Sequence, residues 1–474
     1  MSRRSKSSSA ASAGIARANV GVSIERDCRT AGDRASKAQG VIMRFLGVTE
    51  TCDLAALYLR LLAEGHEVRV AISEPLAQGT LAGLIDQVAD WRAELDWVRA
   101  AGRDGVILFE SVSEGFGALQ DDLRRDGFQV IGGSAYGDRL ENDRAFAQQL
   151  LAELGFPRGH VWEFSCAAEA GAFIAANPAR YVLKFSGADH SADDTYVGEL
   201  ADGSDVRAML VHKVAHRGKV RFILMEHLEG IEVGIGAYFD GEHFLTPACL
   251  DWEHKRFFAG DIGELTGEMG TVATYDRTDH FFESTLARLE PHLRGRGHVG
   301  YINLNTIVNA RGIWPLEFTC RFGYPGFAVL EPLQALSWGL LFRQMLDGVG
   351  GRFPHHPGFA VGVVMTTPPF PYSRHQVSAP VGLPILLDPS LDEAERRHFH
   401  FGEIGSGPGG LVTSGVYGWT MVITAVAPTV AAAQALAYAH IGRITIPNAR
   451  YRRDIGDRLA ATDLAALEQL GLFG

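Results

Sequence analysis

Four oxygen-bearing side chains within residues 301–319 could together hold a divalent cation. Alternating apolar residues predict a β-hairpin here, and the period of two places Asn303 and Asn305 on one face of its first strand. The same alternation places Glu317 and Thr319 on one face of the second strand. Carboxylate, amide and hydroxyl oxygens suit Mg²⁺, which needs only one or two protein ligands when phosphates and water supply the rest. The alternative interpretation is the solvated face of an ordinary hairpin.

Three further charged residues interrupt predicted apolar strands. Lys184, Glu226 and Glu232 lie in short runs that the pattern assigns to strands at residues 181–185, 222–226 and 231–233. Alternation places Lys184 and Glu226 on faces that they share with apolar side chains, and such charges are rarely buried without partners. Each alone could be a surface charge on an edge strand. Three in succession favour a polar site.

The elements before this region predict an open parallel sheet. Helical patterns separate short apolar runs, which lie at residues 42–47, 68–72, 104–109 and 128–132. This order is typical of βαβ units. The dinucleotide fingerprint GxGxxG is absent after the first run, where residues 47–50 read GVTE, so a Rossmann cofactor site lacks its phosphate loop.

The chain divides into four predicted parts. Residues 1–40 form a basic tail without apolar periodicity, which we expect to be disordered. A transit peptide, a basic arm, an incidental tail and a start assigned upstream of Met43 are its alternative explanations. The parts that follow are an α/β domain at 41–138, an α+β domain at 139–352 and a small mixed α/β domain at 353–474.

Composition and charge exclude several classes of protein. With 474 residues, 46% of them hydrophobic and 21% charged, the chain is globular rather than collagen-like, coiled-coil or wholly disordered. The net charge of −12 becomes −17 without the first 40 residues, so we expect no nucleic-acid partner. Five separated cysteines without a CxxC pair predict a reducing, cytoplasmic setting. Because no stretch of 18 apolar residues occurs, we expect no membrane association.

Four segments together resemble the ATP-grasp ligases, and within them the phosphoribosylamine–glycine ligases. These segments are residues 226–232 (EHLEGIE), 254–270 (containing HKR, GDIG and TGEMG), 316–323 (LEFTCRFG), and 410–415 (GLVTSG) with 451–456 (YRRDIG). The resemblance covers about residues 105–458. It implies an N-terminal Rossmann-like domain, a two-lobed ATP-grasp domain whose flexible lobe covers about 145–228, and a small C-terminal domain that closes the substrate site.

The resemblance also implies a binding site for ATP. Lys184, with Arg144 near the start of the domain, would contact the phosphates. Glu226 and Leu228 would form the hinge that meets adenine, and Glu232 would bind the ribose hydroxyls.

The family chemistry transfers the ATP γ-phosphoryl group to a carboxylate, and an amine then attacks the acyl phosphate. Glu317, with Thr319 and Asn305, would hold Mg²⁺ or Mn²⁺. Lys255 and Arg321 would be catalytic, because they would stabilise the transferred phosphoryl group and the acyl phosphate. The implied substrate-binding residues are His254, Arg256, Thr266, Gly267 and Arg453.

The sequence departs from the family pattern at several positions. Thr319 replaces an asparagine at the metal, and Arg144 replaces a lysine. The loop at 186–194 carries three aspartates where the family has glycines and a lysine. Departures are heavier in the segments that border the family's substrates, which correspond here to residues 47–52, 113–115, 324–326 and 400–403.

Three functions are compatible with these residues. The first joins glycine to 5-phosphoribosylamine in purine biosynthesis, so the partners would be ATP, an amino acid such as glycine, and a phosphoribosylamine-like amine. The second is an ATP-grasp ligase for a different carboxylate and amine. The third is a noncatalytic nucleotide-binding protein of the same fold. We expect a monomer or a weak homodimer.

Overall fold

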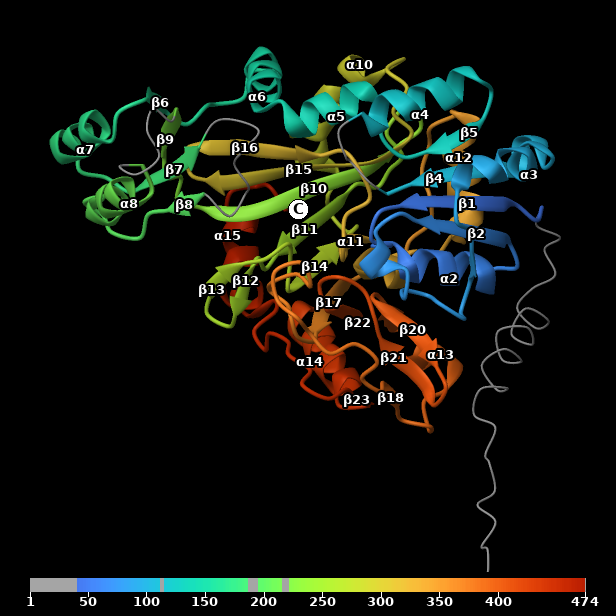
Figure 1. Ribbon diagram of the computed structural model, residues 1–474. Coiled ribbons are helices and arrows are strands. Elements are labelled where there is room, and N and C mark those ends of the chain that lie inside the picture. Colours follow the sequence, from blue (N-terminus) through green and yellow to red (C-terminus); the bar gives the residue numbers. More distant parts are fainter. Residues whose placement is uncertain (1–40, 111–114, 186–194, 215–220, 474) are drawn as a thin grey trace, which may run out of the picture.

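The computed structural model describes residues 41–110, 115–185, 195–214 and 221–473 (Figure 1). The predicted basic tail at 1–40 and the aspartate-containing loop at 186–194 lie outside the described residues. Most of the segment at 113–115, where the family motif has changed, is also outside them. None of the helices in the described ranges is both long and apolar enough to cross a membrane.

The N-terminal part is a five-stranded parallel sheet with the order β3-β2-β1-β4-β5. Its strands are β1 (Arg44–Thr49), β2 (Glu67–Ile72), β3 (Asp86–Gln87), β4 (Gly105–Phe109) and β5 (Gln129–Ile131). Helices α2 (Ala55–Ala63), α3 (Leu95–Arg99) and α4 (Phe116–Arg125) connect them. The predicted parallel sheet is confirmed. β1 begins two residues later than the apolar run suggests, because Val41 and Ile42 are exposed.

Helix α2 shows how the spacing of apolar residues packs a helix against the parallel sheet. Leu57, Tyr58 and Leu61 recur at helical spacing, and all three are completely buried against the sheet. The helix ends before Gly65, whose φ of +91° is the left-handed conformation that glycine adopts without steric cost.

The centre of the molecule is an eight-stranded antiparallel sheet, ordered β16-β15-β10-β11-β14-β17-β22-β19. Its strands are β10 (Ile231–Phe239), β11 (Cys249–Glu253), β14 (Gly270–Thr274), β15 (Gly300–Asn309), β16 (Gly312–Thr319), β17 (Phe359–Thr366), β19 (Phe399–Phe401) and β22 (Trp419–Ala427). The predicted hairpin is confirmed as β15–β16. Its register pairs Asn303 with Thr319 and Asn305 with Glu317, so all four oxygen-bearing residues lie in adjacent rows.

A smaller antiparallel sheet packs beside the central one, with the order β6-β9-β7-β8. It consists of β6 (Val161–Phe164), β7 (Tyr181–Phe185), β8 (Tyr196–Val197) and β9 (Phe222–Glu226), and it packs against α7 (Ala167–Ala176) and α8 (Ser204–Val214). Buried Leu183 faces these helices, whereas Lys184 is half-buried on the opposite face of β7. The predicted alternation along this strand is therefore confirmed.

The remaining elements complete the fold around the sheets (Figure 1). Three two-stranded sheets pair β12 (Arg256–Phe258) with β13 (Ile262–Leu265), β18 (Leu386–Leu387) with β23 (Ile444–Thr445), and β20 (Ile404–Gly407) with β21 (Gly410–Thr413). The other helices are α5 (Ala135–Asn142), α6 (Arg144–Glu153), α9 (Asp279–Ser284), α10 (Glu290–Leu293), α11 (Gly326–Leu330), α12 (Trp338–Asp347), α13 (Glu393–Arg396), α14 (Val430–Ile441) and α15 (Leu464–Gln469).

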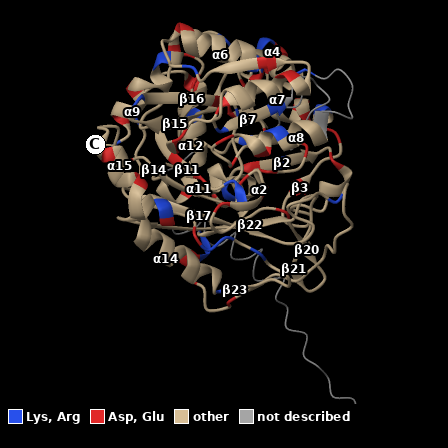
Figure 2. Ribbon diagram, turned by 90° about the vertical axis from the view of Figure 1, so that its left-hand side faces the viewer, with Lys and Arg blue, Asp and Glu red and all other residues tan. Residues whose placement is uncertain are grey.

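The predicted domain boundaries stay a prediction. β17, β19 and β22 come from the part of the chain assigned to the C-terminal domain, and they extend the central sheet that β10, β11, β14, β15 and β16 begin. Figure 2 shows acidic and basic residues interspersed over these elements rather than gathered on one of them.

Candidate functional site

Adjacent strands of the central sheet bring a row of polar side chains together on one face. The Asn305 amide nitrogen donates a hydrogen bond to Glu232 Oε1 at 2.8 Å. Lys255 Nζ lies 2.9 Å from the same Glu232 oxygen and 3.0 Å from Glu253 Oε2. Because β15 and β10 are neighbours, residues 73 positions apart in the chain are in direct contact.

Two cations approach Glu317 from the other side of the site. Lys184 comes from β7 of the smaller sheet and Arg144 from the start of α6, where the Asp143 carboxylate accepts the Phe146 N–H and caps the helix. Burial, reinforced by the Arg144 charge, lowers the pKa of Lys184 to about 8, although Glu317 opposes the shift. Burial also lowers the pKa of Arg144. The two cations thus share an environment that would gain from a bound anion.

The pKa of Lys255 is shifted in the opposite direction from that of Lys184. Burial alone would lower its pKa, but the carboxylates of Glu253, Glu232 and Glu317 outweigh burial and raise it. Lys255 therefore stays charged at every physiological pH. The six residues Arg144, Lys184, Glu232, Lys255, Asn305 and Glu317, all proposed from the sequence, are in contact or in electrostatic interaction with one another.

Thr319 is the last residue of β16, and Arg321 follows two residues later. Both line a cavity next to the central sheet. The Arg321 Nε lies 3.1 Å from Glu141 Oε1, and the other oxygen of Glu141 accepts the Cys320 N–H at 2.9 Å. Glu141 thus orients Arg321, which is one of the residues that line the cavity. The cavity encloses about 640 Å³, its opening included.

The proposed adenine hinge has partners of its own. The Glu226 carboxylate accepts hydrogen bonds from the Arg311 guanidinium at 3.3 Å and from the His160 N–H at 3.3 Å. A Cβ added to Gly159 would lie 3.7 Å from the side chain of Leu228, so the segment before β6 and the segment after β9 run close together. The roles of Glu226 and Leu228 in binding adenine stay a prediction.

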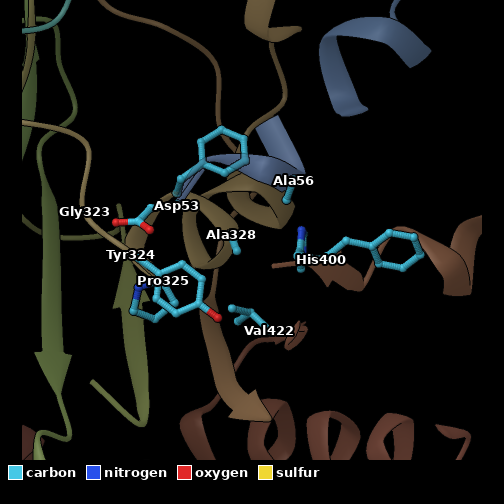
Figure 3. A pocket seen from close by; sticks show the side chains of 10 residues that line it. Asp53, Ala56, Gly323, Tyr324, Pro325, Ala328, His400 and Val422 are labelled. Carbon is cyan, nitrogen blue, oxygen red and sulfur yellow. The ribbon is translucent and has the colours of Figure 1, made fainter. Parts of the chain in front are cut away.

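The carboxyl edge of the parallel sheet is acidic. Asp53 follows β1 and Glu110 follows β4, at the point where the strand order reverses and ligands bind in open α/β sheets. Burial, with Asp53 nearby, raises the pKa of Glu110 to about 8, and burial raises that of Glu403 to about 7. Figure 3 shows Asp53 with Tyr324 and His400 around a pocket of about 230 Å³ at this edge.

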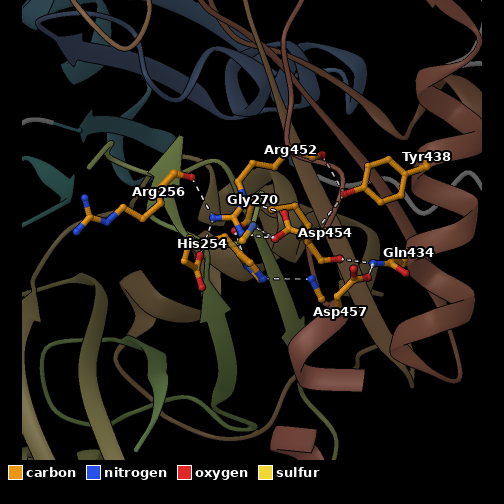
Figure 4. Close-up of polar contacts among 12 residues, drawn as sticks. His254, Arg256, Gly270, Gln434, Tyr438, Arg452, Asp454 and Asp457 are labelled. Carbon is orange, nitrogen blue, oxygen red and sulfur yellow. Dashed lines mark hydrogen bonds and ion pairs between the residues drawn. The ribbon is translucent and has the colours of Figure 1, made fainter. Parts of the chain in front are cut away.

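The proposed substrate-binding residues lie where β11, β12 and the C-terminal segment meet (Figure 4). His254 Nδ1 lies 3.2 Å from the Gly270 carbonyl, and its Nε2 accepts the Gly456 N–H at 3.1 Å. The Thr266 hydroxyl donates to the Lys255 carbonyl at 2.8 Å. Gly267 is exposed, and a Cβ there would lie 2.9 Å from the Trp419 ring.

Arg452 is the anchor of this junction. It is buried, it contacts Asp454 at 2.6 Å and Asp261 at 2.8 Å, and it also donates to the Arg256 carbonyl at 3.0 Å. Its neighbour Arg453 is exposed and lies over the Tyr451 ring. The substrate contacts proposed for His254, Arg256, Thr266, Gly267 and Arg453 stay a prediction.

Comparison with known proteins assigns the chain to a family. The model of the phosphoribosylglycinamide synthetase ATP-grasp (A) domain matches residues 142–327. The phosphoribosylamine–glycine ligase of Rhizobium meliloti is 30% identical over 369 residues, which cover 73% of this chain and 82% of that relative. This chain belongs to the phosphoribosylglycinamide synthetase family.

Solved structures agree on the ATP-grasp fold. The phosphoribosylamine–glycine ligase from Thermotoga maritima matches with a TM-score of 0.64 at 20% identity and covers 87% of this chain and 100% of that one. The biotin carboxylase domain of Hydrogenobacter thermophilus 2-oxoglutarate carboxylase, solved with MgADP and bicarbonate, matches with a TM-score of 0.60 at 12% identity over 92% and 99% of the two chains. The chain is thus an ATP-grasp ligase related to glycinamide ribonucleotide synthetase.

Sequence reasoning missed several polar residues of this ATP-grasp ligase. Glu141 orients Arg321, and Asp251 and Glu268 line the cavity beside it. One signal was available in the sequence, because Asp251 and Glu253 alternate with the apolar residues Leu250 and Trp252 in the segment that forms β11. Glu268 lies in a turn, where alternation gives no information about burial.

Proposed function

We propose that the chain is an ATP-dependent carboxylate–amine ligase that forms an amide through an acyl phosphate and releases ADP and phosphate. The observation that carries this proposal is the convergence of Arg144, Lys184 and Lys255 on Glu317 between two sheets. Such a cluster binds a polyphosphate by charge and orientation, which is what phosphoryl transfer requires of a protein.

A divalent cation fits the residues that face this cluster. Glu317 offers an exposed carboxylate, and Asn305 and Thr319 in adjacent rows offer amide and hydroxyl oxygens. These three residues would hold Mg²⁺ or Mn²⁺, which neutralises charge on the transferring phosphoryl group. The asparagine-to-threonine change at 319 keeps an oxygen ligand, and Asn305 supplies an amide oxygen nearby.

The chain's own cations complete the chemistry. Lys184 and Arg144 bind phosphate oxygens, and the fixed charge of Lys255 stabilises the transferred group. Arg321, oriented by Glu141, holds the reacting carboxylate and then the acyl phosphate. No side-chain nucleophile takes part, because the substrate carboxylate attacks the phosphoryl group and the amine expels phosphate.

The substrate pair has two candidates. The names of the relatives favour glycine and 5-phosphoribosylamine. The acidic carboxyl edge of the parallel sheet favours a different pair. Burial already raises the pKa of Asp53, Glu110 and Glu403 there, and a bound phosphate would oppose the ionisation of these acids further.

The test is ADP release by the purified protein with Mg-ATP. Glycine is supplied with phosphoribosylamine generated in place, and then other amino acids and amines are supplied. Turnover with glycine and phosphoribosylamine supports the first pair, and turnover with other substrates alone supports the second. ATP binding without ADP release under any condition would show a noncatalytic nucleotide-binding protein.

A further inference from the structure

The cavity beside Arg321 contains carboxylates that the proposed phosphoryl transfer does not use. Asp251 from β11 and Glu268 from the turn before β14 both line it, and their side chains are 8% and 5% exposed. A Cβ at Gly234 would lie 2.2 Å from Asp251 Oδ1, so a glycine on the neighbouring strand makes room for this carboxylate. The two acids are therefore buried residues of the fold and not exposed surface residues.

Several buried oxygens of the cavity lack a partner within the described part of the chain. Asp251 Oδ1, Glu268 Oε1 and Thr271 Oγ1 accept no hydrogen bond from any described residue. The other Asp251 oxygen accepts from the Asn303 amide at 2.6 Å. A buried oxygen without a partner costs about 1–3 kcal/mol, so a ligand with several N–H donors would gain by supplying them.

Most of the titratable groups that line the cavity are acids. Asp251, Glu253 and Glu268 are among its lining residues. Arg321 also lines the cavity, but its guanidinium group is already paired with the Glu141 carboxylate. Lys255 also acts on this region, but Glu253 and Glu232 hold its ammonium group. Burial and, to a smaller extent, the nearby carboxylates raise the pKa of Asp251 to about 8. The same two causes raise the pKa of Glu268. A cationic ligand would relieve this repulsion.

The cavity suits an organic cation better than a metal ion. Among the residues that the structure describes, no three His, Cys, Asp or Glu side chains are grouped closely enough to hold a metal. The side chains of Tyr238, Tyr301, Phe322 and Tyr324 form aromatic walls. Aromatic faces attract alkylammonium and guanidinium groups and cover their apolar parts.

We propose that this cavity binds the basic end of a substrate, an alkylammonium or guanidinium group, on a molecule whose reacting carboxylate faces Arg321. The inference rests on the proposed ligase function and narrows its substrate to the class of basic amino acids. Asp251 and Glu268 determine this specificity, and Thr271 supplies a further acceptor. A phosphorylated substrate would meet the wrong charge here.

The test is calorimetric titration of the full-length protein with Mg²⁺ and a nonhydrolysable ATP analogue. The probes are L-lysine and L-arginine, with L-norleucine as the neutral analogue of lysine and ribose 5-phosphate as the anionic probe. We expect a basic probe to bind at least about tenfold more tightly than norleucine, since charge-assisted hydrogen bonds exceed neutral ones. Asp251→Asn and Glu268→Gln should each remove most of this preference.

Matched controls keep the outcomes separate. Glu283→Gln changes an exposed carboxylate of α9 and should bind like the wild type, and thermal unfolding of each variant checks its fold. Equal binding of lysine and norleucine, a preference for ribose 5-phosphate, or wild-type preference in both cavity variants would overturn the inference. Preferential binding of a basic probe without ADP release would support the cavity assignment and count against the ligase proposal instead.

Discussion

Lys184 and Lys255 show how neighbours give two lysines of one site different behaviour. Lys184 is half-buried and lies near the Arg144 cation, so its pKa falls to about 8. Lys255 lies between Glu232 and Glu253, and its pKa rises. Lys184 therefore loses its charge just above neutral pH unless a bound anion holds it, whereas Lys255 keeps its charge without one.

This difference predicts how ATP affinity depends on pH. The charged form of Lys184 is lost as pH rises through about 8, and the neutral form no longer attracts phosphate. We expect ATP to bind up to about tenfold more weakly at pH 9 than at pH 7, since each pH unit above the pKa lowers the charged fraction about tenfold. Titration calorimetry across this range measures it. Lys184→Arg stays charged and should flatten the profile; parallel profiles for the two proteins would reject the assignment.

Glu317 allows a direct test of the metal site. Glu317→Gln removes the carboxylate charge but keeps the shape of the side chain, so we expect ADP release to be abolished while the protein still unfolds cooperatively. The side chain is exposed, so the fold does not depend on it. Glu317→Asp, which keeps the charge, should retain part of the activity. A wild-type rate for Glu317→Gln would remove Glu317 from the metal site.

The junction between β12–β13 and the C-terminal segment depends on one arginine. Arg452 joins Asp261 of the hairpin to Asp454 after the last strand, and its side chain is 1% exposed. Because it also binds the Arg256 carbonyl, it fixes the backbone of β12 directly after Lys255. The C-terminal segment thus helps to hold the site in position without touching the phosphates.

Replacing this arginine should destabilise the protein. Arg452→Ala removes the guanidinium from the Arg256 carbonyl and leaves the Asp454 carboxylate with the Gly260 N–H as its donor, and we expect a loss of about 2–3 kcal/mol in the free energy of unfolding. The loss is moderate because Asp261 is exposed and can be hydrated. Arg453→Ala, the exposed neighbour, should change stability by less than about 0.5 kcal/mol. Urea unfolding compares the two, and equal stabilities would refute the anchor role.

The sequence pattern located elements better than it located this junction. The limits expected for β7 and β9 match the structure residue for residue, because regular alternation marks a buried face. The segment around Arg452 is irregular, so no period indicates that Arg452 is buried and Arg453 exposed.

The grouping of the cavity acids was unpredictable for a related reason. Asp251 and Glu268 come together only when β11 and β14 pair and the segment before β14 reaches the cavity. Local sequence specifies each strand, but their pairing across the sheet is a tertiary property. The hairpin β15–β16 was predictable because its partners are close in sequence.

At the scale of the molecule, an acidic chain must hold an anionic nucleotide. Residues 41–474 carry a net charge of −17, so the long-range field opposes ATP, and short-range contacts must outweigh it. Arg144 and Lys184 come from outside the central sheet, whereas Lys255 and Glu317 lie next to it or in it. ATP between them would link the smaller sheet to the central one.

Mg-ATP should therefore stabilise the whole protein against heat. A ligand that binds the folded state alone, at a hundred times its dissociation constant, adds about 2.7 kcal/mol, which for a chain of this size corresponds to a rise in Tm of roughly 3–5 °C. Differential scanning calorimetry measures the shift with Mg-ATP, with ATP and a chelator, and with no nucleotide. In Glu317→Gln the part of the shift that depends on Mg²⁺ should disappear while the effect of ATP alone remains. An unchanged Tm with saturating Mg-ATP would mean that the cations from the two sheets do not meet on one nucleotide.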